Sequence, residues 1–140
     1  MRIWLFGTRR FGATNHAASL PVRAHVRQIV AALPFDVTVV EGEAMGPDRW
    51  ARTYARDRGL AVERHPVTAL DWARYGRRAG VLRNEEMASS GVNAAIGWWD
   101  GESAGTKNSI TLCEKFGIPY VVYVYNDQGR IVDTLKGTPP

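Results

Sequence analysis

The chain is poor in cysteine and has no long apolar run. Cys113 is the only cysteine among 140 residues, so no intrachain disulfide can form. Its helical spacing from Ile110 and Phe116 predicts a small core residue. No run approaches the roughly 18 apolar residues that span a membrane, and Ile3–Phe6 is too short for a secretion signal. We therefore expect a cytoplasmic protein with no membrane partner.

Charge of one sign is never concentrated in this sequence, although the formal net charge is +4. Without a run of like charges a nucleic-acid tail is not expected, and the three histidines lack the spacing of metal ligands. Lys107, Lys115 and Lys136 are the only lysines, so arginine carries most of the positive charge. Because guanidinium groups match phosphate geometry, this balance favours an anionic ligand, although a GC-rich genome would give the same composition.

Apolar and polar residues alternate in a way that predicts strands interleaved with helices. The periodicities are those of short buried strands and amphipathic helices, punctuated by glycine and proline. The predicted strands are Arg2–Phe6, Asp36–Val40, Leu60–Arg64, Val92–Trp98, Tyr120–Tyr125 and Arg130–Leu135. The predicted helices are Ser19–Leu33, Pro47–Arg58, Gly76–Ser90 and Gly105–Phe116, and His65–Tyr75 is expected to be irregular.

This alternation predicts an α/β fold of the Rossmann-like type, with three layers arranged α/β/α. The central sheet is expected to hold five parallel strands in the order 3-2-1-4-5. The turn signal Asn126–Gly129 predicts a hairpin that adds a C-terminal antiparallel strand at an edge. The length suits a single domain, which we set at residues 1–138, with Pro139-Pro140 as a frayed tail.

Two loops of small residues follow predicted strands. Gly7-Thr8-Arg9 comes after the first strand, and Asp100–Thr106 comes after the fourth strand and opens a helix. Free N–H groups and the helix dipole make such turns suitable for an anion. Parallel sheets bind ligands beyond the carboxyl ends of their strands, where Glu41–Asp48 also falls. Neither a full G-x-G-x-x-G nor a P-loop motif is present, which excludes a standard dinucleotide fold and a P-loop ATPase.

The predicted ligand site combines these loops with one face of the helix 76–90. Arg9 offers a positive charge directly after a strand, and the loop glycines allow close backbone approach to an anion. Arg83 and Asn84 share a helical face with Gly80 and Met87, with an internal brace as their alternative role. The predicted ligand-binding residues are Gly7, Thr8, Arg9, Gly42, Gly46, Asp48, Arg83, Asn84, Gly101, Ser103, Gly105 and Thr106.

Several candidates have a purely structural alternative. Hydroxyl residues of the last loop can merely cap the helix, and Asp48 can simply favour the positive end of its own helix. Of Trp98 and Trp99, one is expected in the core while the other is available to stack on a base. Trp72 is expected to pack in the core, with covering the pocket as its alternative. The histidines are expected to be structural or exposed.

Four segments of the chain also resemble a known superfamily. They are GTR at residues 7–9, EGEAMGPD at 41–48, the R-N-x-x-M helix at 83–87 and DGESAGT at 100–106. In this order they resemble the SLOG superfamily of Smf/DprA and Lonely Guy relatives, in its small YspA/YpsA-like branch, over roughly residues 1–124. The resemblance implies a Rossmann-like fold that binds nucleotides or nucleotide-derived ligands, and pairing of copies into a homo-oligomer. No cofactor is expected.

The resemblance leaves the activity open between binding and hydrolysis. Lonely Guy enzymes hydrolyse the N-glycosidic bond of a nucleoside monophosphate with glutamates that directly follow their P-G-G-x-G-T loop. Here Lys107-Asn108-Ser109 follows Thr106, so that acid is missing, and only Arg83 corresponds to the arginine of their R-K helix motif. Other carboxylates that could serve instead are Glu41, Glu43, Glu85 and Glu86.

Two classes of function follow from these motifs. The first is a module that senses or sequesters a nucleotide or nucleotide-derived ligand, such as an ADP-ribose derivative. The alternative is a nucleotide-processing hydrolase of the phosphoribohydrolase type, which requires a carboxylate near the ribose C1′. A DNA-binding role like that of the DprA branch would need a continuous basic groove, whereas the arginines here are scattered, so nucleic acid is not an expected partner.

Overall fold

A six-stranded sheet forms the middle layer of the fold, in the order β3-β2-β1-β4-β5-β6. The structure is a computed structural model that describes residues 1–137, so residue 138 and the predicted tail Pro139-Pro140 lie outside it. The strands are β1 Arg2–Gly7, β2 Thr38–Glu41, β3 Ala61–Arg64, β4 Ala94–Trp99, β5 Tyr120–Tyr125 and β6 Ile131–Gly137. The helices are α1 Ser19–Ala32, α2 Pro47–Asp57, α3 Ala69–Tyr75, α4 Arg78–Ser89 and α5 Ala104–Lys115, with a 3-10 turn, η1, at Arg9–Gly12.

The predicted strand order is confirmed. Strands β1 to β5 pair in parallel in the order 3-2-1-4-5, and β6 pairs antiparallel with β5. The hairpin between them closes where the predicted turn lies, with Asn126 N donating to Arg130 O at 2.9 Å. The strand order reverses direction between β1 and β4. Strands β2 and β3 extend the sheet on one side of β1, whereas β4 and β5 extend it on the other side.

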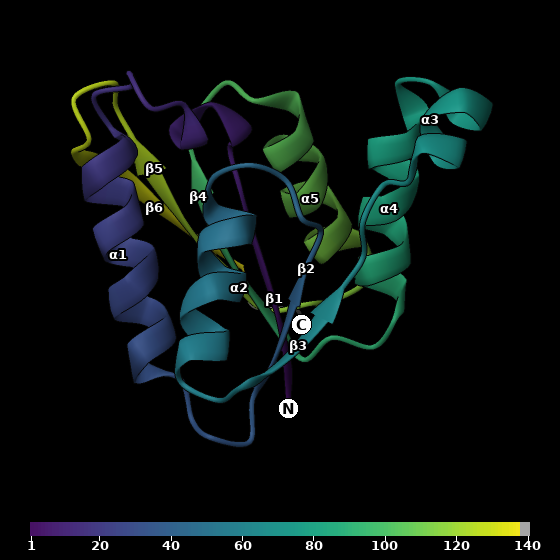
Figure 1. Ribbon diagram of the computed structural model, residues 1–140, viewed down its shortest axis with the longest axis horizontal. Helices are drawn as coiled ribbons and strands as arrows, with labels where there is room; N and C mark the ends of the chain where they lie inside the picture. The colour runs from purple at the N-terminus through teal and green to yellow at the C-terminus, as the bar shows by residue number, and fades with distance from the viewer. Residues whose placement is uncertain (138–140) are drawn as a thin grey trace.

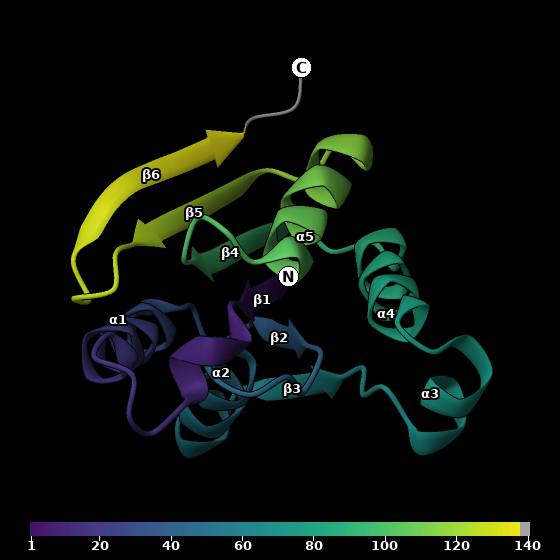
Figure 2. The same cartoon turned by 90° about the horizontal axis from the view of Figure 1, so that it is seen from above.

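Helices cover both faces of the sheet. Figures 1 and 2 show α1 and α2 on one face and α4 and α5 on the other. Side chains of β1 alternate between the two cores: Leu5 packs with the valines of α1, whereas Trp4 and Phe6 pack with Met87 of α4 and residues of α5. The lone cysteine, Cys113, is fully buried in the second core, as its spacing predicts.

The segment 65–75 contains a helix, α3, so its prediction as irregular was wrong. Thr68 and Asp71 form a capping box, in which Thr68 Oγ1 accepts from Asp71 N at 3.1 Å and Asp71 Oδ2 accepts from Thr68 N at 2.9 Å. No residue of α3 is buried, and the helix stands clear of the sheet (Figure 2). Because α3 covers no core, its sequence carries no apolar periodicity, and only the capping pair could have indicated a helix.

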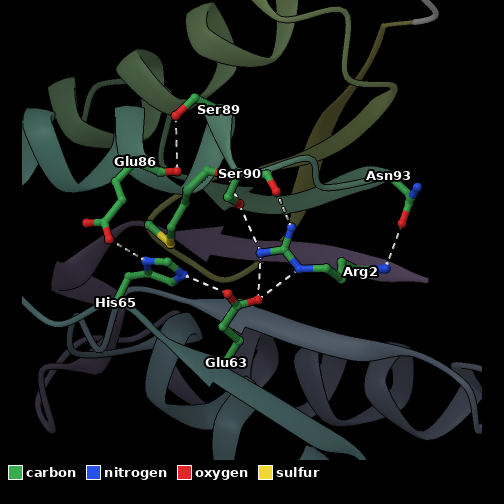
Figure 3. A network of polar contacts seen from close by, with 8 residues as sticks. Arg2, Glu63, His65, Glu86, Ser89, Ser90 and Asn93 are labelled. Carbon is green, nitrogen blue, oxygen red and sulfur yellow. Dashed lines mark hydrogen bonds and ion pairs between the residues drawn. The ribbon is translucent and has the colours of Figure 1, made fainter.

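A polar network ties β1 to β3 and to α4 (Figure 3). Arg2 Nε and Nη2 donate to Glu63 Oε2 at 2.9 and 2.6 Å, and Arg2 Nη1 donates to Ser90 O at 2.6 Å. His65 lies between two carboxylates, 3.4 Å from Glu63 Oε1 and 3.3 Å from Glu86 Oε1. The network therefore fixes α4, which carries two of the predicted site residues, over the β3 edge of the sheet.

We expect Gly97→Ala to lower the free energy of unfolding by about 1–3 kcal/mol, as overpacking of a core does. Gly97 lies in β4 against the ring of Phe6, and an added Cβ would overlap the ring carbons. Denaturant unfolding would measure the change. Gly80→Ala in α4 is the matched control, because its added Cβ meets no atom within 4 Å. The control should be neutral or more stable by up to about 1 kcal/mol. Equal stability of Gly97→Ala and the parent would contradict this packing.

Candidate functional site

A cavity of about 610 Å³ opens at the carboxyl ends of β1 and β4, where the strand order reverses. This is the place at which parallel α/β sheets bind ligands. Four segments far apart in the sequence line the cavity. They contribute Phe6, Gly7, Thr8, Arg9 and Arg10; Ala44 and Asp48; Trp72, Arg77, Gly80, Val81, Arg83, Asn84 and Met87; and Asp100, Glu102, Ser103, Ala104, Gly105, Thr106 and Ser109.

Most of the predicted ligand residues line this cavity, and three glycines do not. Gly42 lines a neighbouring cavity of about 240 Å³ that shares Arg9 and Arg83 with the larger one. Gly46 has a φ of +83° and packs so closely on η1 that an added Cβ would lie 3.1 Å from the backbone nitrogen of Gly12. Gly101, with a φ of +80°, forms an exposed turn. Gly46 and Gly101 therefore shape the loops and do not form the cavity wall.

Two buried hydroxyls join the loops that follow β1 and β4. Thr8 Oγ1 lies 3.2 Å from Thr106 Oγ1, and the two residues are only 2% and 3% exposed. Thr8 Oγ1 also accepts a hydrogen bond from Asp100 N at 3.2 Å, while Thr8 N donates to Trp98 O at 2.9 Å. The two loops that the sequence singled out separately therefore form one polar surface inside the cavity.

Asp100 organises the second loop, and it was not among the predicted site residues. Its Oδ1 accepts from Ser103 N at 2.7 Å and from Glu102 N at 2.9 Å, and its Oδ2 pairs with Arg10 Nε at 2.7 Å. Burial alone would raise the pKa of this carboxyl, but these hydrogen bonds and the charge of Arg10 hold the pKa below its ordinary value. The signal was present in the sequence, since an aspartate before glycine at a strand end is typical of an Asx-turn.

The first turn of α5 is open to a ligand. Ser103 occupies the N-cap position, but within residues 1–137 no side chain caps this helix. The first N–H groups of a helix have no partner inside it, so they remain available to an anion or to water. Gly105 lies in this turn, and an added Cβ there would meet no atom within 4 Å.

Asp48 connects the loops after β1 and β2. It is buried at the start of α2, and its Oδ2 accepts from Gly42 N at 3.0 Å. The backbone amides of Ala44 and Gly7 lie near this carboxyl and help to lower its pKa. Burial nevertheless raises the pKa to about 6, outweighing the nearby charge of Arg83 and the backbone amides. Although Asp48 lines the cavity, its carboxylate accepts a hydrogen bond from the backbone of the loop after β2.

Arg83 braces α4 against the loop after β2 and Asn84 braces it against α5, which agrees with the alternative role predicted for this pair. Arg83 Nη1 donates to Gly42 O at 2.8 Å, and Asn84 Nδ2 donates to Asn108 Oδ1 at 3.1 Å. Both residues also line the larger cavity. Bracing and ligand contact are therefore compatible for them.

The two arginines that follow Thr8 differ in the contacts that their side chains make. Arg10 pairs with Asp100 and, through Nη2, with Asp127 Oδ1 at 2.7 Å in the β5–β6 hairpin. Arg9 is exposed, lines both cavities, and makes no ion pair or side-chain hydrogen bond within the described chain. The charge of Arg9 is thus available to a ligand.

The tryptophans depart from two expectations. Trp98 is fully buried in the first core, as one of the pair was expected to be. Trp99 does not line the larger cavity, because its Nε1 donates to Ser103 O at 3.1 Å and so supports the loop from behind. Trp72 is 47% exposed and lines both cavities, so its expected place in the core was wrong.

None of the four alternative carboxylates lines the larger cavity. Glu41 is fully buried, with Oε2 accepting from Glu43 N at 2.6 Å and with no partner for Oε1. Burial, helped by the charge of Asp48, raises the pKa of Glu41 to about 7. Glu43 has a φ of +61° and pairs with arginines of α2 and β3, and Glu86 belongs to the network with His65. Among residues 1–137 no group of histidine, cysteine and acidic side chains is arranged to hold a metal.

We expect the protein to lose stability as the pH rises from about 4 to about 7. The folded state raises the pKa of Glu41 from 4.5 to about 7 and that of Asp48 from 3.8 to about 6, so it keeps protons that the unfolded chain has already released. Stability then falls through this window and levels off above it. Glu41→Gln should remove the contribution of Glu41 to this pH dependence, on the order of 3 kcal/mol at most, so that the free energy of unfolding changes less with pH. Denaturant unfolding of the parent and the variant at pH 5 and pH 8 measures the two pH dependences. A pH dependence in Glu41→Gln that is as steep as that of the parent would contradict the buried, protonated Glu41.

Comparison with known proteins gives one informative relative. No protein-family model matches the chain. The chain is 36% identical over 92 residues to the Gene 61 protein of Mycobacterium phage D29, an alignment that covers 63% of this chain and 72% of the phage protein. In the part of the chain that the structure describes, no helix has both the length and the apolar character needed to cross a membrane.

Proposed function

The chain belongs to the family of the phage Gene 61 protein, and we propose that it binds a nucleotide or nucleotide-derived ligand, as a sensor or sequestering module. The observation that carries this proposal is the cavity at the ends of β1 and β4, with a volume of about 610 Å³ and uncommitted polar groups at one end. Ligand sites have volumes of roughly 300–1,000 Å³, and a few polar groups fix the orientation of their ligand. The resemblance to the SLOG superfamily implies the same class of ligand.

The phosphate is proposed to lie between Arg9 and the first turn of α5. Two kinds of donor meet there, the unpaired guanidinium of Arg9 and the uncapped amides of α5, and the hydroxyl of Thr106 lies beside them. Helix N-termini favour anions, and a guanidinium forms charge-assisted hydrogen bonds to phosphate. Asp100 does not oppose the phosphate, because Arg10 neutralises it and its oxygens are already bonded.

The remainder of the ligand is proposed to extend toward α4. Phe6, Val81 and Met87 give this part of the cavity apolar surface. This part of the cavity also has the polar side chains Arg77, Arg83 and Asn84, so it suits a base or a sugar, while the donors at the loops suit the charged end of the ligand. A nucleotide has this division, whereas inorganic phosphate and a purely apolar ligand do not.

Binding without turnover is the form of the function that the side chains favour. The carboxylates that line the cavity are Asp48, Asp100 and Glu102. The first two are engaged by backbone amides, and Glu102 lies exposed at the rim. Lys107 stands where a catalytic glutamate follows the loop in the Lonely Guy enzymes. Hydrolysis of an N-glycosidic bond would need a carboxylate free to act near the ribose.

A nucleotide hydrolase of the phosphoribohydrolase type is the second candidate, and one observation favours it. Asp48 lines the cavity with a pKa raised to about 6, so it changes protonation state close to neutral pH, as a general acid or base does. Incubation with nucleoside monophosphates, followed by chromatography for free base and ribose 5-phosphate, distinguishes the two. If the parent releases free base and Asp48→Asn does not, the protein is a hydrolase, and the proposal of binding without turnover is wrong.

We expect Arg9→Ala to weaken binding of the cognate nucleotide about tenfold to a hundredfold. A hydrogen bond to a charged group contributes roughly 1.5–3 kcal/mol, and Arg9, unlike its neighbour Arg10, forms no ion pair with a carboxylate of residues 1–137. Titration calorimetry with a panel of nucleoside monophosphates and ADP-ribose measures the loss. Arg56→Ala is the control, since Arg56 is exposed in the last turn of α2 and lines neither cavity.

Thr106→Val should weaken binding less than Arg9→Ala, because the backbone amides of α5 remain in place. Both variants should keep the melting temperature close to that of the parent, apart from the small cost of leaving Thr8 without its hydroxyl neighbour. Unchanged affinity in Arg9→Ala would show that the phosphate is not held at this loop.

A homo-oligomer in the cytoplasm is also proposed, in line with the pairing that the superfamily resemblance implies. Aromatic side chains at the surface are candidates for such an interface. Tyr54 is engaged within the protomer, where its hydroxyl accepts from Arg23 Nε at 2.8 Å, and Trp50 packs on the first core. Tyr75 on α3 is 41% exposed and remains available. Light scattering tests the proposal, and a monomer at high micromolar concentration would remove it.

A further inference from the structure

We propose that Trp72 of α3 is the residue on which the nucleobase of the ligand stacks, so that α3 is the element that recognises the base. This inference rests on the proposed function and goes beyond it, because the phosphate loops alone would accept any phosphorylated sugar. It assigns a role to the one helix of the described chain, α3, that buries none of its residues.

Core packing does not account for the position of Trp72. The side chain is 47% exposed, and it belongs to neither hydrophobic core. A large aromatic side chain left in water forgoes the burial that normally stabilises it. Trp72 borders both the larger and the smaller cavity, so the exposed surface of the indole faces space that a ligand can fill.

The backbone of Trp72 is held although its side chain is not. At one end of α3 the capping box of Thr68 and Asp71 closes the first turn. At the other end Gly76 N donates to Trp72 O at 2.9 Å, and Gly76 takes a φ of +56° that sends the chain on into α4. A short helix with both ends closed presents an aromatic ring at a fixed place without needing a core beneath it.

Trp72 and the proposed phosphate loops line different parts of one cavity. Figure 2 shows α3 set apart from the carboxyl ends of β1 and β4, the strands that lead into those loops. Val81 of α4 lines the same cavity and gives it further apolar surface. Phosphate and base occupy opposite ends of a nucleotide, so a phosphate at the loops directs the base toward α3. Aromatic side chains stack on any base, because every base has a π-face.

The test compares a ligand that has a base with one that lacks it. Calorimetric titrations, or competition where binding is weak, would use the nucleoside monophosphate that the parent binds best and ribose 5-phosphate. Trp72→Ala should weaken nucleotide binding roughly 5- to 150-fold, which corresponds to the 1–3 kcal/mol of one stacked base. Binding of ribose 5-phosphate should change less than about twofold. Trp72→Phe, which keeps an aromatic face, should retain most of the nucleotide affinity.

Tyr75→Ala is the matched control. Tyr75 lies on the same helix and is 41% exposed, but it lines neither cavity. It should leave the affinities for both ligands unchanged, and circular dichroism of all three variants checks that the fold persists. A loss in Tyr75→Ala as large as that in Trp72→Ala would mean that α3 acts through its packing on α4, which would overturn the inference.

The remaining outcomes separate this inference from the proposed function. Equal nucleotide affinity in the parent and Trp72→Ala overturns the stacking role and leaves nucleotide binding intact. An equal loss for both ligands in Trp72→Ala also overturns it, because the ring would then contact the sugar or the phosphate. A parent that binds no nucleotide and no phosphorylated sugar would remove the proposed function itself, and the inference with it.

Discussion

The buried carboxylate of Asp48 is the group on which the geometry of the cavity depends. It accepts the amide N–H of Gly42 after β2 at 3.0 Å, and the amides of Gly7 after β1 and of Ala44 and the charge of Arg83 from α4 lie nearby. Arg83 in turn donates to Gly42 O. One side chain at the start of α2 therefore fixes the relative positions of three segments, and its raised pKa reflects the burial that this position requires.

The loop after β4 is held by a separate but similar device. Asp100 accepts two amides of its own loop and pairs with Arg10, while Thr8 joins this loop to β1 through its hydroxyl. The two aspartates thus bind the backbone groups that would otherwise have no partner, and they leave the hydroxyl of Thr106 and the first turn of α5 toward the cavity. The polar groups open to a ligand are those that the aspartates do not use.

The sheet and the place of the cavity could be predicted from the sequence because both follow from local patterns. Apolar strands alternating with amphipathic helices admit few topologies, and the loops Gly7–Arg9 and Asp100–Thr106 necessarily meet once β1 and β4 are neighbours. The helix α3 and the position of Trp72 could not be predicted in this way. A helix that covers no core has no periodicity, and hydrophobicity alone assigned the tryptophan to an interior that it does not enter.

The different roles of Arg9 and Arg10 could not be predicted from the sequence. They are neighbours of the same type after the same strand, and nothing local distinguishes them. Their roles are separated by Asp100 and Asp127, which lie about 90 and 117 positions further along the chain and reach Arg10 only because β4 and the β5–β6 hairpin pack beside β1. Because two carboxylates occupy Arg10, its charge cannot also serve a phosphate at full strength. Arg9 has no such partner among residues 1–137, so tertiary pairing, and not residue type, leaves the charge of Arg9 available while that of Arg10 is neutralised.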